Sequence, residues 1–194
     1  MKRLSLYLFL ILFTLQTPSH ADDIRDFQIG GMSVGDSLLD YMSEEEIKES
    51  VVNAYPDKKF AILFYKKSTK NYDWGVGVTY KSNDKKYKIY GVQGRASFEN
   101  IGGCYEKQDE IEKEISLIFD KVKKKNWGIL KLHLKGEETE GSTYKPITFD
   151  FNNGDRAMIS CYYYHDNSPH LLKISMFLKE LNEYLESPPE PANN

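Results

Sequence analysis

His165, Asp166 and His170 form the cluster whose side chains are best suited to binding a metal ion or moving protons. Imidazole nitrogens and carboxylate oxygens are ordinary zinc ligands, and the four-residue spacing of Asp166 and His170 suits one helix face. However, Ser168 and Pro169 predict that a helix begins inside this interval, so the three side chains would have to converge from a loop. The favoured interpretation is a solvated loop at a helix entrance. The alternative is a metal-dependent or hydrolytic enzyme that uses this cluster.

Other sequence patterns for bound ions or phosphates are incomplete. The glycines of Gly75-Val-Gly77 lack the lysine and the following helix that a phosphate loop requires. The acidic runs at 44–46 and 137–140 lack the spaced oxygen ligands of a calcium loop and indicate surface charge. We therefore expect no cofactor and no bound metal, and a non-catalytic protein is favoured over an enzyme.

The two cysteines, Cys104 and Cys161, predict an intramolecular disulfide in a chain that reaches an oxidising compartment. Such a bond would stabilise the fold by about 4 kcal/mol in the chain-entropy model. A cysteine nucleophile is the alternative, but it would need a positioned histidine, and no such signature lies nearby.

Three consecutive tyrosines, 162–164, end an expected strand, so Tyr162 and Tyr164 share the face opposite to Tyr163. Exposed tyrosines suit contacts with proteins or sugars because they offer area and a hydroxyl at low entropic cost. Together with Trp74 and Tyr80, Tyr162 and Tyr164 form the candidate binding surface. Ordinary packing between neighbouring strands is the alternative interpretation of all four rings.

The amino terminus predicts export. Lys2 and Arg3 precede an apolar run from Leu6 to Leu15, and a small-residue site predicts cleavage after Ala21. A membrane anchor is the alternative, but the run has roughly half of the ~20 residues that a spanning helix needs. Cleavage would change the net charge from −3 to about −5, which argues against a nucleic-acid partner. We expect a periplasmic or secreted protein without a membrane span, with another envelope protein as its candidate partner.

Two short helices are expected at the start of the mature chain. The first is predicted between Ser33 and Met42, and the second begins at a capping box, Ser43 to Glu46, and stops at Pro56. The surrounding segment, FQIGGMSVGDSLLDYMSEEEI, resembles a family of uncharacterised exported proteobacterial proteins that begin with GMSxGDSLLD. It is distantly similar to small outer-membrane assembly lipoproteins and beta-lactamase-inhibitor-like domains. The resemblance implies an exported location and an overall architecture, but it implies no biochemical activity.

The rest of the chain predicts two sets of three strands, each followed by a helix. Apolar stripes predict helices at 104–125 and 168–187, and alternating or apolar runs predict the strands, which are 60–65, 74–80, 87–92, 130–134, 147–151 and 157–164. The expected fold is therefore α+β, with antiparallel strands covered by amphipathic helices in the order αα-βββα-βββα. Residues 22–187 would form a single domain or two βββα subdomains, and 188–194 a disordered tail.

These patterns favour a non-catalytic exported protein that binds or assists another envelope protein through its sheet. The enzyme that would use the histidine cluster is the alternative. A small-molecule carrier is a third possibility, and it would require an apolar cavity between the sheet and the helices.

Overall fold

The computed structural model describes residues 23–55, 57–65, 75–119, 121–132, 141–166 and 168–187. The predicted signal peptide and the predicted tail lie outside these ranges. Within them, nine strands form one sheet in the order β1-β2-β3-β4-β9-β8-β7-β5, with β6 also paired to β7. The bounds are β1 Val51–Ala54, β2 Phe60–Tyr65, β3 Val76–Lys81, β4 Ile89–Phe98, β5 Lys123–Asn126, β6 Leu130–Lys131, β7 Thr143–Asp150, β8 Arg156–Tyr163 and β9 His170–Phe177.

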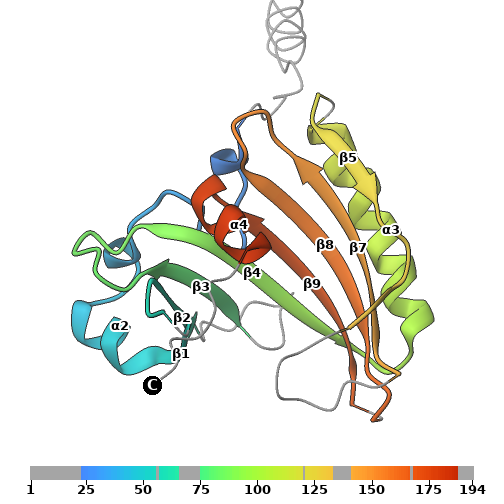
Figure 1. The fold of residues 1–194 in the computed structure, drawn as a ribbon, viewed down its shortest axis with the longest axis horizontal. Coiled ribbons are helices and arrows are strands. Elements are labelled where there is room, and N and C mark those ends of the chain that lie inside the picture. Colours follow the sequence, from blue (N-terminus) through green and yellow to red (C-terminus); the bar gives the residue numbers. More distant parts are fainter. Residues whose placement is uncertain are drawn as a thin grey trace, which may run out of the picture.

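Every strand pair is antiparallel, and the chain builds the sheet from two meanders. Strands β1 to β4 are consecutive neighbours, and helix α3 (Ile101–Ile118) then carries the chain to the far edge. Strands β7, β8 and β9 return toward the centre, where β9 pairs with β4 along eight residues. The sheet curves strongly, with β1 to β3 turned away from β7 and β8 (Figure 1).

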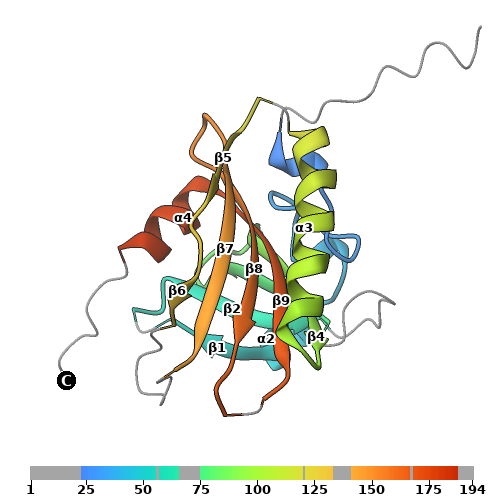
Figure 2. The same ribbon diagram turned by 90° about the vertical axis from the view of Figure 1, so that its right-hand side faces the viewer.

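The two longer helices of the second half lie on opposite faces of the sheet (Figure 2). We call these the α3 face and the α4 face, after α3 and α4 (Lys179–Glu186). Side chains alternate between them along β9, because successive residues of a strand point to opposite sides. Leu172 and Ile174 lie beside α3, whereas Leu171 and Lys173 lie on the α4 face.

The main hydrophobic core fills the α3 face. An amino-terminal segment, with the short 3₁₀ turns η1 (Ile24–Asp26) and η2 (Leu38–Asp40), packs there beside α3 and contributes a set of buried side chains, namely Ile24, Ile29, Met32, Val34 and Leu38. Helix α3 begins at the side-chain cap of Asn100 and contributes Cys104 and Ile115 to this core. The N-terminal segment and α3 together cover the apolar sides of the central strands.

A smaller core lies beneath α4, where Leu181 and Tyr184 pack against Phe60. Leu178 precedes the helix without a side-chain cap, and the buried carboxylate of Asp155 instead accepts from the backbone N–H of Lys179 at 2.7 Å. Gly91 of β4 allows a close approach, because a Cβ there would lie 2.6 Å from Leu181 Cδ2. The position of α4 is therefore set by a cap from the β7–β8 turn and by a glycine in the sheet.

The predicted disulfide is confirmed. Cys104 of α3 and Cys161 of β8 are bonded, with their Cα atoms 6.0 Å apart. Gln108, one turn further along the helix, is fully buried, and its Nε2 donates to the carbonyl oxygens of Lys145 and Ile159 at 2.7 and 3.1 Å. Helix α3 is thus fixed to β7 and β8 by one covalent bond and two hydrogen bonds.

The predicted helices at the amino terminus are shorter in the structure. The capping box of Ser43 and Glu46 is present and opens helix α2 (Glu44–Ser50), but Val51–Ala54 forms strand β1 rather than a last helical turn. Two β-branched residues, Val51 and Val52, favour this change, because they fit an extended chain better than a helix. The helix predicted between Ser33 and Met42 is reduced to the single turn η2.

The two later helices also end or begin differently from the prediction. Helix α3 stops at Ile118, and Lys123, Lys124 and Lys125, which close the predicted helix 104–125, belong to β5. The predicted helix 168–187 is strand β9 as far as Phe177, and only its second half is α4. The spacing of its leucines and isoleucine fits the period of a helix and also that of a strand. In the structure, β4 and β8 form hydrogen-bonded ladders on the two sides of β9. Tertiary pairing therefore decided a pattern that was locally ambiguous.

The α+β class agrees with the structure, but the order αα-βββα-βββα was too specific. The order is α2, β1 to β4, α3, β5 to β9 and α4, once the 3₁₀ turns are set aside. The expected strands 60–65, 147–151 and 157–164 correspond to β2, β7 and β8, and the turn at Asn152–Gly154 joins β7 to β8. Gly154 has a φ of 89°, which explains the choice of glycine there.

Candidate functional site

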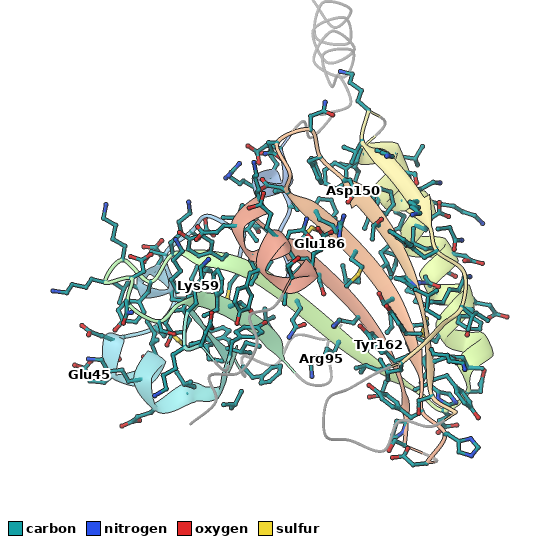
Figure 3. All side chains as sticks on the ribbon, in the orientation of Figure 1. Glu45, Lys59, Arg95, Asp150, Tyr162 and Glu186 are labelled. Atoms are coloured by element: carbon teal, nitrogen blue, oxygen red, sulfur yellow. A yellow bond between two sulfur atoms is a disulfide. The ribbon has the colours of Figure 1, made fainter. Side chains whose placement is uncertain are left out.

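The part of the α4 face that lies beyond α4 contains a hollow that we call the tyrosine groove. Its volume is about 570 Å³, and it is lined by Arg95, Lys131, Leu132, Tyr144, Tyr162, Tyr164, Leu171, Lys173 and Leu185. Arg95 and Tyr162 lie below α4 on this face (Figure 3). Strands β4, β9, β8 and β7 supply the floor, so residues from both meanders meet in it.

Three tyrosine rings form a row across the groove. Tyr144 and Tyr162 are direct partners in the β7–β8 ladder, and their rings stack with centroids 5.7 Å apart and planes inclined by 14°. Tyr162 and Tyr164 are separated by one residue, which places them on the same side of the chain, with centroids 6.4 Å apart. The ammonium of Lys173 lies 5.0 Å from the Tyr162 ring centroid. The row offers flat apolar area with hydroxyls and a cation at its border.

Arg95 is the charged group of the groove that is most withdrawn from water. Its guanidinium lies 4.8 Å from the Phe64 ring centroid, and its buried Nε has no hydrogen-bond partner among the residues that the structure describes. Burial lowers the pKa of Arg95, and the nearby Tyr164 and Tyr162 act against this effect. The pKa of Tyr144 is raised, first by burial and then by Tyr162. A guanidinium cation and the neutral phenol of Tyr144 therefore face the groove at neutral pH.

The groove has an unbalanced charge. Three cationic side chains, Arg95, Lys131 and Lys173, line it, and no carboxylate is among the lining residues that the structure describes. Elsewhere in these ranges, cations are commonly paired, as in the contacts of Lys81 with Glu180 at 2.7 Å and of Arg156 with Glu186 at 2.6 Å. The groove is thus a place where an anionic group could be bound by hydrogen bonds and by charge.

The structure brings together two of the four predicted surface residues, Tyr162 and Tyr164. Tyr80 lies elsewhere and is only 5% exposed, with its ring 5.6 Å from that of Tyr87 in the main core. Trp74 lies outside the described residues. Tyr144 was missed, although the Asn152–Gly154 turn fixes a register that places it opposite Tyr162.

Arg95 was also missed, because the expected strand ended at Val92. In the structure β4 continues to Phe98, paired throughout with β9, which itself had been predicted as helix. Its position could not be found without that partner strand. The alternation of Gly94, Arg95 and Ala96 gives a signal only once the chain is known to be extended there.

The structure does not gather His165, Asp166 and His170 into a group of three metal-ligating side chains. His165 packs against Gly141, and its backbone N–H donates to Ser142 Oγ at 3.1 Å. The His170 ring stacks on Tyr163 with centroids 5.1 Å apart. Asp166 accepts from the backbone N–H of Ser168, and this hydrogen bond lowers the pKa of its carboxyl. No group of three or more metal-ligating side chains is found in the described part of the chain.

A further sequence motif resembles that of a catalytic serine, and the structure shows whether its local geometry fits. The residues Gly31-Met-Ser33-Val-Gly35 match the Gly-x-Ser-x-Gly motif of serine hydrolases. Ser33 is 5% exposed, and its hydroxyl donates to the carbonyl oxygen of Phe27 at 2.9 Å. The segment lies between short turns and not between a strand and a helix, so the motif lacks the elbow that exposes a nucleophile.

None of the helices in the described ranges has the length and apolar character needed to cross a membrane. No protein family matches the chain. No curated protein matches it significantly. A role for the tyrosine groove is therefore inferred from its own residues.

Proposed function

We propose that this protein is an exported, non-catalytic binding protein of the cell envelope, and that its tyrosine groove holds an acidic segment of another envelope protein. The observation that carries the proposal is the half-buried Arg95, whose Nε finds no partner in the described ranges, beside a stacked row of tyrosines. An unpaired buried donor costs free energy that an arriving acceptor would recover.

The chemistry of the groove favours a carboxylate-bearing peptide over a neutral one. Arg95 has a planar guanidinium that suits carboxylate oxygens, and Lys131 and Lys173 extend the positive charge along the floor. Tyrosine rings contribute contact area to protein interfaces at low entropic cost. An extended acidic segment could place its backbone along the row of rings and its carboxylates toward the three cations.

An envelope location is supported by features outside the groove. The basic start, the apolar run and the small-residue site at Ala21 are typical of a secretory signal. The Cys104–Cys161 disulfide is a bond that persists in oxidising compartments. Periplasmic or secreted placement is part of the proposal and is tested by fractionating cells that express the full chain and measuring its cleaved mass.

Binding is tested by titrating the protein with a fluorescently labelled octaglutamate peptide, with octaglutamine as the uncharged control. We expect binding of octaglutamate that weakens as salt is raised, because exposed charges are screened. The substitution Arg95→Gln should weaken it about tenfold or more, since a hydrogen bond to a charged group is worth about 1.5–3 kcal/mol. Lys173→Gln should weaken it less.

The matched control is Lys113→Gln, which removes an exposed lysine of α3 on the opposite side of the sheet. It changes the net charge by the same amount as Lys173→Gln but should leave peptide affinity unchanged. Equal losses in both lysine variants would mean that only net charge matters, and the groove would not be the site. Equal binding of octaglutamine would exclude recognition of acidic side chains.

A further inference from the structure

A second hollow lies on the α3 face, on the other side of the sheet from the tyrosine groove. It has a volume of about 610 Å³ and is lined by Phe27, Gln28, Ile29, Gly94, Ala96, Phe98, Lys107, Ile111, Glu114, Ile115, Ile118, Leu172 and Ile174. We call it the α3 cavity. Its size falls within the range of about 300–1,000 Å³ that is typical of small-molecule sites.

The cavity arises because α3 is held close to the β7–β8 part of the sheet and passes over β9 and β4 at a greater distance. Cys104 and Gln108 tie the helix to β7 and β8, whereas its later residues lie over β9 and β4. There β4 presents small residues, Gly94 and Ala96, which leave space beneath the helix. The amino-terminal segment closes one end, where Phe27 packs on Phe119 with ring centroids 5.3 Å apart.

The lining is mainly apolar. Ile115 and Leu172 are at most 4% exposed, and Ile29 is 1% exposed, so the inner wall has little contact with water. The polar lining residues are Gln28, Lys107 and Glu114. Lys107 is paired with the exposed Glu110 at 2.7 Å, so the charged side chains lie at the solvent edge of the helix. One cation and one carboxylate in the lining give it no net charge.

The shape of the cavity follows the helix. The α3 residues that line it run from Lys107 to Ile118, which corresponds to a length of ~16 Å along the helix axis. This length suits an extended chain of roughly a dozen carbon atoms. A branched or polycyclic ligand would need a wide pocket. This apolar lining instead follows one helix and two neighbouring strands, which favours a linear ligand.

We propose that the α3 cavity binds one unbranched acyl chain of a single-chain amphiphile, with the polar head group at the solvent edge near Lys107 and Glu114. Free fatty acids and lysophospholipids both carry such an acyl chain. Because the charges of Lys107 and Glu114 cancel at the solvent edge, the cavity would recognise the acyl chain and not the charge of the head group. This site is independent of the tyrosine groove, because no lining residue is shared.

The experiment is isothermal titration calorimetry of the full mature chain with octanoate, decanoate and dodecanoate below their micellar concentrations. We expect each added pair of methylene groups to tighten binding about tenfold, since every buried methylene contributes to transfer from water. A dodecanoyl lysophosphatidylcholine is titrated in parallel. Binding of dodecanoate alone identifies a free fatty acid as the source, and binding of the lysolipid alone identifies a lysophospholipid.

Two variants locate the site. Ile111→Trp fills the cavity and should weaken dodecanoate binding at least tenfold, whereas Leu117→Trp, on a side chain that is 78% exposed, should not. Thermal unfolding shows whether Ile111→Trp folds. If it does not, Ala96→Leu replaces it, because the larger side chain narrows the cavity from the sheet side. The proposal would be overturned if the affinity did not depend on chain length, or if a folded cavity-filling variant bound dodecanoate as tightly as the wild type. It would also be overturned if neither amphiphile bound.

Discussion

The two faces of the sheet are made by the same strands but are completed in opposite ways. On the α3 face, an 18-residue helix and the amino-terminal segment cover the apolar side chains and border a mainly apolar cavity that is partly open to solvent. On the α4 face, an eight-residue helix covers only a small core and leaves a row of tyrosines with three cations open. Alternation along β4 produces both, with Ala96 facing the cavity and Arg95 the groove.

The difference shows that one sheet can carry two hollows of different chemistry that share no lining residue. The binding that we propose for the tyrosine groove would depend on charge and should weaken with salt, whereas the binding that we propose for the α3 cavity would depend on apolar area and should not. The helices also differ in their attachment, because α3 is held by a disulfide and α4 by a buried carboxylate cap. Each prediction below perturbs the attachment or packing of one face, and two of them also measure whether the other face responds.

The largest effect is expected from removing the covalent attachment of α3. The double variant Cys104→Ala and Cys161→Ala opens a 57-residue loop and should lower the free energy of unfolding by about 4 kcal/mol. Urea unfolding measures this loss. Reducing agent should destabilise the wild type similarly and leave the double variant unchanged. A loss below 1 kcal/mol would show that Gln108 and apolar packing are sufficient to hold the helix.

The next effect is expected on the other face. Leu181→Ala removes a fully buried side chain of α4 and should cost about 3 kcal/mol in unfolding free energy. Leu185→Ala, on the same helix but 39% exposed, is the control and should cost much less. If Leu181→Ala also weakened dodecanoate binding in the α3 cavity, the two faces would be coupled through the sheet and not independent.

A smaller effect is expected from the cap of α4. Asp155→Ala deletes the acceptor for the Lys179 N–H and should lower the free energy of unfolding by about 2 kcal/mol. Asp166→Ala removes an exposed carboxylate that accepts a comparable hydrogen bond in the β8–β9 turn, and it should have a smaller effect. Equal losses would indicate that turn formation, and not the attachment of α4, determines the cost.

The parts of the fold that could be predicted from sequence are those fixed by covalent or local chemistry. Two cysteines in an expected exported chain define one bond, and the residues Asn152 to Gly154 define a hairpin turn and hence the register that pairs Tyr144 with Tyr162. The capping box at Ser43 is equally local. Each of these depends on neighbours in sequence or on a unique partner.

The parts that could not be predicted depend on distant partners. His170–Phe177 becomes a strand because β4 and β8 pair with it, and neither partner can be identified from the run itself. Because β9 was assigned to a helix, the extension of β4 to Arg95 and Ala96 was lost with it. Arg95 in the groove and Ala96 in the cavity were therefore both beyond sequence reasoning, for the same physical reason.

The smallest effect is expected from Tyr184, whose hydroxyl donates to Asp57 Oδ1 at 2.8 Å beside α4. Burial and then this carboxylate raise the pKa of Tyr184 to about 12, above the value near 10 that an unfolded chain would show. Since the folded state holds the proton more tightly, the contribution of Tyr184 to stability is complete below pH ~10 and is lost as the pH rises toward 12.

Tyr184→Phe should therefore make stability fall less steeply over that interval, measured as urea midpoints between pH 9 and pH 11.5. Tyr41 on the α3 side is the matched comparison, because burial and a hydrogen bond to Asp36 also raise its pKa to about 12. Tyr41→Phe should flatten the same alkaline decline, and the two effects should add if the faces are energetically separate. Strong non-additivity would instead show that the sheet transmits strain between α3 and α4.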